Sequence, residues 1–139
     1  MKLGARKIIA SRTAPQAYGA YAQATAVNMP LKGLVFASGQ IGVDAATGTM
    51  PEDAAGQATQ AMKNVMAVLA EGDSGPKKTL AITLYLTDIN ERDAVTDACR
   101  TFFPNGEYPA LSVVEVSHLP KDALVEIEAI AHQVNKSPV

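Results

Sequence analysis

The spacing of apolar residues changes period several times along this chain, and these changes constrain the fold more than any other feature. In residues 54–69 apolar residues recur at steps of three and four, which indicates an amphipathic helix. Residues 79–88 alternate with period two, as a half-buried strand does. Helical spacing returns in residues 91–103. Helices that alternate with strands predict a sheet with helices packed against it.

Strand patterns occupy the two ends of the chain. After a short apolar start at residues 7–10, residues 21–28 and 34–41 are predicted to form a hairpin around a turn at 29–33. The last two strands are expected at residues 111–117 and 124–133, joined by a turn at 119–122. Residues 1–139 are therefore predicted to form one α+β domain, a mixed sheet with two helices on one face.

The second face of that sheet is expected to be neither fully polar nor fully apolar. Tyr85, Val113 and Ile130 are assigned to it, among Thr, Ser and Glu residues. Such a face is too apolar for open water and too polar for a sealed core. It predicts an oligomer with pockets between its subunits.

Composition excludes several classes of protein. No apolar run approaches the roughly 20 residues of a membrane-spanning helix, and one cysteine builds neither disulfides nor a cysteine metal cluster. We expect a reducing, cytoplasmic compartment. Residues 1–43 hold five basic residues and no acid, as a mitochondrial transit peptide does, but continue into patterned strands. The remaining chain is acidic, which argues against nucleic acid as a partner.

Carboxylates within an apolar strand are the first candidates for chemistry. Glu126 and Glu128 share one face of the last strand, and Glu115 lies in the strand before it. Carboxylates are rarely buried without a partner. This face is therefore either solvated and salt-bridged, or it holds acids for use.

Other polar residues carry weaker signals. Ser38 and Gly39 end a buried-looking strand and would present a hydroxyl and backbone N–H groups to a ligand. His118 and His132 have no spacing typical of a catalytic triad or a metal site and are assigned to the surface or to turns. Cys99 falls on the apolar stripe of its helix and is expected in the core. We predict neither a metal nor a cofactor.

Several strings resemble those of the Rid (YjgF) family, also called the L-PSP endoribonuclease family. They are GAYAQA at 19–24, ASGQI at 37–41, NVMAVL at 64–69, PALSVVEV at 109–116, LPKD at 119–122 and VEIEAIA at 125–131. The resemblance implies a chorismate-mutase-like fold and a homotrimer with small-molecule pockets at its subunit interfaces. It also implies cofactor-free hydrolysis of reactive imines and enamines to 2-keto acids and ammonia. An endoribonuclease activity, attributed to some members, disagrees with the acidic composition.

The resemblance also implies roles for individual residues. Glu126 matches the glutamate that positions or activates water, and Tyr21 matches a pocket tyrosine; these two are the predicted catalytic residues. Ser38 and Gly39 match residues that line the substrate pocket.

Three predicted substrate-binding positions depart from the family pattern. Leu111 stands where deaminases carry the arginine that binds the substrate carboxylate, Val113 replaces a cysteine and Thr96 an asparagine. Charge-assisted hydrogen bonds contribute roughly 1.5–3 kcal/mol each, so losing one or two weakens anion binding by about one to four powers of ten. Two functions remain open: a deaminase of weakened or altered activity, and a non-catalytic trimeric module that binds small molecules.

Overall fold

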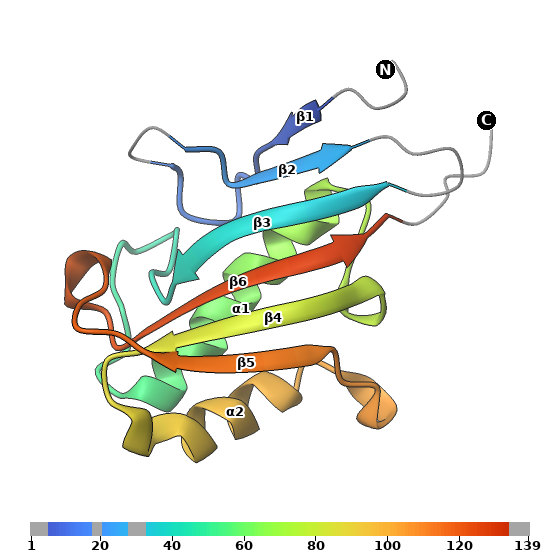
Figure 1. Ribbon diagram of the computed structural model, residues 1–139. Helices are drawn as coiled ribbons and strands as arrows, with labels where there is room; N and C mark the ends of the chain where they lie inside the picture. The colour runs from blue at the N-terminus through green and yellow to red at the C-terminus, as the bar shows by residue number, and fades with distance from the viewer. Residues whose placement is uncertain (1–5, 18–20, 28–32, 134–139) are drawn as a thin grey trace.

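Helices cover only one face of the sheet in the computed structural model, which describes residues 6–17, 21–27 and 33–133 (Figure 1). The elements are β1 (Arg6–Ile9), β2 (Ala24–Val27), β3 (Leu34–Ile41), α1 (Ala54–Glu71), β4 (Thr79–Leu86), α2 (Arg92–Arg100), β5 (Ala110–Glu115) and β6 (Val125–His132). Short 3₁₀ turns lie at Pro76–Lys78, Ile89–Glu91, Pro104–Gly106 and Pro120–Asp122. The predicted mixed α+β sheet with two helices on one face is confirmed.

The strand order is β1-β2-β3-β6-β4-β5. β2 and β3 form the predicted antiparallel hairpin, while most of its turn, residues 28–32, lies outside the described residues. β6 lies between β3 and β4 and is antiparallel to both. β4 and β5 are parallel, so the chain must cross over between them, and α2 makes this connection.

Local signals explain where the helices begin and end. The Asp53 side chain accepts a hydrogen bond from the Gly56 N–H at 3.2 Å and caps α1. α2 ends at Arg100, earlier than the predicted 103. Pro104 disfavours the helical conformation at the residue before it, and Phe103 is extended, with φ −114° and ψ 99°.

The core lies between the helices and the sheet. Met62, Leu69, Leu84 and Ile127 are among its fully buried side chains. Cys99 packs in this core, as predicted, and burial raises the pKa of its thiol to about 12. A thiol with so high a pKa is a poor nucleophile at neutral pH. Among the described residues, no helix combines the length and apolar character needed to cross a membrane.

One predicted face assignment is wrong. Val113 lies opposite Leu84 in the parallel β4–β5 pair, whereas Tyr85 lies opposite Glu126 in the β4–β6 pair. Directly paired residues share a face, so Val113 faces the helices, where it packs against the core, and Tyr85 faces the open side. A one-residue difference in register moves a side chain to the other face, and register with a distant strand has no local signature.

The open face nevertheless carries exposed apolar side chains. Phe36 and Ile130 are directly paired on it and are 43% and 37% exposed. Val114, opposite Tyr85, adds a third such side chain on the edge strand. The assignments of Ile130 and Tyr85 to this face are confirmed, whereas Phe36 and Val114 were not assigned to it from the sequence.

Two buried amides of α1 fasten the strand ends that border this face. Asn64 Nδ2 donates to the carbonyls of Ile41 and Val43 at 3.0 and 2.8 Å. Gln57 Oε1 accepts from the Leu124 N–H at 2.8 Å. The end of β3 and the start of β6 are thereby held to one helix.

We expect Asn64→Ala to lower the free energy of unfolding by about 2–3 kcal/mol, because two buried carbonyls lose their donor. Chemical denaturation measures this. Lys63→Ala, at the exposed neighbouring position of α1, is the control and should change stability by less than about 0.5 kcal/mol. Equal effects of the two substitutions would contradict this account of Asn64.

Candidate functional site

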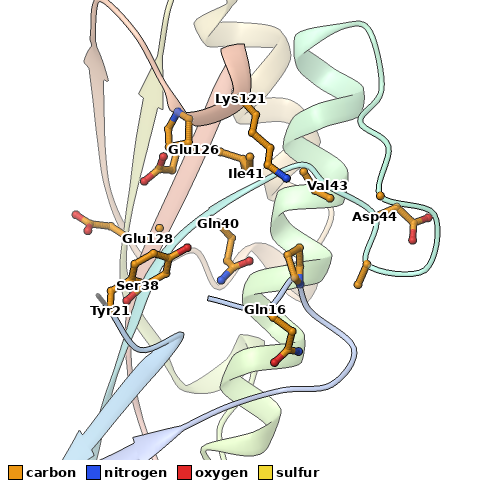
Figure 2. A pocket seen from close by; sticks show the side chains of 15 residues that line it. Gln16, Tyr21, Ser38, Gln40, Ile41, Val43, Asp44, Lys121, Glu126 and Glu128 are labelled. Atoms are coloured by element: carbon orange, nitrogen blue, oxygen red, sulfur yellow. The ribbon is translucent and has the colours of Figure 1, made fainter. Parts of the chain in front are cut away.

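A cavity of about 490 Å³ lies where the end of β3 meets β6. Figure 2 shows the side chains that line it, with Lys121 reaching toward it from the turn before β6. We call it the Glu126 cavity. Its lining includes Gln16, Tyr21, Ser38, Gly39, Gln40, Lys121, Glu126 and Glu128.

A bulge in β3 makes room for the Glu126 carboxylate. The β3–β6 register shifts between Ala37 and Gln40, so Ser38 and Gly39 lie in an irregular stretch. A Cβ atom on Gly39 would overlap Glu126 Oε1 and lie 2.8 Å from its carboxyl carbon. A side chain at this position would push the carboxylate away from the strand.

Ser38 holds the Tyr21 segment in place. Its hydroxyl donates to the Ala22 carbonyl at 2.5 Å, and its backbone N–H donates to the Gln23 carbonyl at 2.7 Å. Both bonds join the bulge to the residues that follow Tyr21. The hydroxyl proton of Ser38 is therefore used within the protein, and the serine positions one wall of the cavity.

The two carboxylates of β6 have different environments. Glu128 Oε1 accepts a hydrogen bond from the Tyr85 hydroxyl at 2.6 Å. This bond, burial and the charges of both glutamates raise the pKa of Tyr85. Burial, and secondarily the charge of Glu128, raise the pKa of Glu126. A half-buried carboxyl with a raised pKa holds a proton more firmly than an ordinary glutamate does, which suits it to accept one.

The remaining predicted site residues lie on the helix side of the sheet. Thr96 and Leu111 line a separate hollow of about 220 Å³ between α2 and β5, which we call the α2–β5 hollow. Its other lining residues are Ile82, Cys99, Arg100, Phe103, Tyr108 and Pro109. Val113 also faces the helices from β5. Within one chain the structure thus brings together Tyr21, Ser38, Gly39 and Glu126, but not Thr96, Leu111 and Val113.

Several residues that line the cavity were not predicted as site residues from the sequence. Gln40 and Lys121 both line the Glu126 cavity. Gln40 directly follows the Ser-Gly pair, and Lys121 has a left-handed backbone, with φ 54°, in the turn before β6. Polar residues next to a bulge or in a strained turn are signals that could have identified them.

The other residues that were considered for a chemical role do not line the Glu126 cavity. Glu115 does not belong with Glu126, because it ends β5 on the opposite face and accepts the Ile89 N–H at 3.0 Å. His118 is exposed in the loop between β5 and the turn at Pro120–Asp122, whereas His132 is the half-buried last residue of β6. Across the described ranges, no group of three or more His, Cys, Asp or Glu side chains is placed to hold a metal ion.

Comparison with known proteins identifies the family. The family model described as Endoribonuclease L-PSP matches residues 11–133. This chain belongs to the Rid family. A related Rid protein is the 2-iminobutanoate/2-iminopropanoate deaminase of Salmonella typhimurium, 39% identical over 90% of this chain and 96% of that protein.

Solved Rid structures resemble this one over nearly their whole length. Escherichia coli TdcF with bound serine is 36% identical, with a TM-score of 0.82 over 92% of this chain and 99% of that one. A Rid-family protein of unknown function from Yersinia pestis is 41% identical, with a TM-score of 0.84 over 91% of this chain and 98% of that one.

We expect the stability gained by Glu126→Gln, relative to the wild type, to increase as pH rises. Burial raises the folded-state pKa of Glu126, so the folded state of the wild type loses stability as pH rises from the ordinary glutamate value of 4.5 through the raised value. Glutamine carries no charge and escapes this loss. Melting temperatures of both proteins between pH 4 and 8 measure the difference, which should be small at pH 4; a difference independent of pH would contradict the assignment.

Proposed function

We propose that this Rid protein is a hydrolytic deaminase of small reactive imines and enamines, with altered substrate preference. The observation that carries the proposal is the Glu126 carboxyl, held against Gly39 in a cavity that Tyr21 also lines, with a pKa raised by burial. The names of relatives at about 39% identity, 2-iminobutanoate/2-iminopropanoate deaminases, support it.

The proposed reaction needs one proton acceptor and one water molecule. The Glu126 carboxylate takes a proton as the water oxygen bonds to the imine carbon. The same proton then passes to the nitrogen, which gives a carbinolamine. Glu126 next takes the proton of the new hydroxyl and delivers it to the nitrogen as the carbon–nitrogen bond breaks, so that a ketone and ammonia leave. Tyr21 orients the substrate or the water. No electrons are transferred, so the reaction needs no redox cofactor.

The full site is proposed to form between subunits of a homotrimer with the chorismate-mutase-like arrangement. The exposed and directly paired Phe36 and Ile130 form an apolar patch of the kind that subunit contact covers, and Val114 adds apolar surface on the edge strand. In a closed ring, the Glu126 cavity of one chain faces a different surface of the next. We propose that this surface is the α2–β5 hollow, with Leu111 and Thr96.

Leu111 is the reason to propose altered preference. Its side chain is 42% exposed and lines the hollow, where it offers no hydrogen-bond donor. The same observation favours the second candidate function, a trimeric module that binds a small molecule without converting it.

Glu126→Gln should lower kcat for hydrolysis of freshly generated 2-iminobutanoate by about 10²–10⁴-fold, because the amide accepts no proton. Release of ammonia and 2-oxobutanoate measures turnover. Glu107→Gln, in an exposed loop, is the control and should leave kcat unchanged. Binding of 2-oxobutanoate without any imine hydrolysis by the wild type would instead support the binding module.

Leu111→Arg should raise kcat/KM for 2-iminobutanoate by about tenfold or more, because a guanidinium adds charge-assisted bonds to the carboxylate that persist in the transition state. Leu111→Met, of similar length and without charge, is the matched control. An unchanged kcat/KM in the arginine variant would refute this role of position 111.

Sedimentation at micromolar concentration should give a mass three times the 14.5 kDa of one chain. Phe36→Glu should reduce the trimer fraction, because a charge on the patch must be desolvated on assembly. Ile89→Glu, at an exposed apolar residue outside the sheet, should not. A wild type that sediments as a single chain would rule the trimer out.

A further inference from the structure

We propose that Arg100 of α2 binds the carboxylate of a small aliphatic 2-oxo or 2-imino acid in the α2–β5 hollow. Arg100 would thereby take the role of the arginine that deaminases carry at the position of Leu111. Arg100 lines the same hollow as Leu111 and Thr96. The inference rests on the proposed function for its substrate class. Binding of a stable 2-oxo acid tests it independently of turnover.

Helix geometry directs Arg100 and Thr96 to the same place. They are four residues apart on α2, so their side chains lie on one face of the helix. That face borders β5, whose Leu111 forms the opposite wall. Arg100 and Thr96 therefore border one small volume.

The contacts of the Arg100 guanidinium leave donors for a ligand. Its Cζ lies 5.6 Å from the centre of the Tyr108 ring, and its Nη1 lies 3.4 Å from Asp97 Oδ1. The Arg100 and Asp97 side chains are 55% and 73% exposed, and ion pairs between exposed groups contribute little. A guanidinium has five N–H donors and binds a carboxylate through two of them.

Thr96 provides an independent indication of a ligand. The residue is only 8% exposed, and its Oγ1 is buried without a hydrogen-bond partner among the described residues. A buried hydroxyl without a partner destabilises the folded state. A polar ligand group in the hollow would supply the missing partner.

The other walls define the rest of the ligand. Ile82, Phe103 and Leu111 present apolar surface. The volume of about 220 Å³ is below the roughly 300–1,000 Å³ of sites for drug-sized molecules, so it suits an acid of a few carbons. With the carboxylate at Arg100 and the 2-oxo or 2-imino group near Thr96, the aliphatic chain would contact these walls.

Calorimetric titration with 2-oxobutanoate, on the intact protein, tests the assignment. Arg100→Met should weaken binding tenfold or more, and Arg100→Lys should have an intermediate effect because lysine keeps the charge but not the paired donors. Arg92→Met, at an exposed arginine of the same helix that does not line the hollow, is the matched control and should bind as the wild type does. Equal affinities for Arg100→Met and the wild type would overturn the proposal.

Two further variants separate binding from folding. Asp97→Asn should tighten binding a few-fold, because it removes the anion nearest the guanidinium. Thr96→Val should weaken binding without lowering the melting temperature, because it removes an unpartnered hydroxyl and keeps the side-chain shape. A melting temperature that falls with affinity would assign Thr96 a structural role and count against the proposal.

Methyl NMR locates the ligand. Addition of 2-oxobutanoate should shift the signals of Leu111 and Thr96, and Arg100→Met should abolish these shifts. Shifts confined to residues of the Glu126 cavity would overturn the proposal.

If the wild type hydrolyses no imine and the Arg100-dependent binding persists, the deaminase assignment fails and the Arg100 assignment stands. If hydrolysis occurs and Arg100→Met leaves KM unchanged, the Arg100 assignment fails alone.

Discussion

The pairing of β6 on both of its edges is the constraint on which the rest of this structure depends. β6 is antiparallel to β3 on one side and to β4 on the other, so both of its edges are hydrogen-bonded. Two partners define one register, and register decides the face of every side chain. Ile127 is thereby committed to the core, and Glu126 and Glu128 to the open face.

Partial burial of the Glu126 and Glu128 carboxylates on the open face of the sheet costs free energy of desolvation. The surrounding residues offset this cost only in part. Tyr85 provides a hydrogen bond to Glu128, whereas Glu126 is left with a raised pKa. Gly39 gives the carboxylate room, at the loss of a side chain that could pack. The proposed proton transfer by Glu126 would thus be gained where local stability is reduced, as is common at catalytic sites.

The two halves of the proposed site are anchored differently. The Glu126 cavity borders strand ends that the buried amides of Asn64 and Gln57 hold to α1. The α2–β5 hollow lies at the sheet edge, and its cation stands on an exposed helix face. An exposed guanidinium binds an anion more weakly than a buried one, because water competes for the same donors. Apolar contacts with Leu111 and its neighbours would then contribute a larger share of the binding.

Local sequence patterns determined much of this protein by themselves. The two periods of apolar spacing predicted both helices and the strands, and VEIEAIA predicted that Glu126 and Glu128 share a face, because side-chain alternation is a property of a single strand. The resemblance of short strings to the Rid family identified Tyr21, Ser38 and Gly39, which the structure places around the same cavity.

Tertiary structure alone decided what depends on pairing between distant segments. The insertion of β6 between β3 and β4, and the parallel register that turns Val113 toward the helices, are set by contacts that no single segment encodes. The bulge at Ser38 and Gly39 likewise exists only relative to β6. Arg100 and Leu111 line one hollow because α2 lies beside β5, and Thr96, whose hydroxyl is buried without a partner among the described residues, lines the same hollow. Periodicity reports which way a residue points within its own element; only the packed fold determines what it then faces.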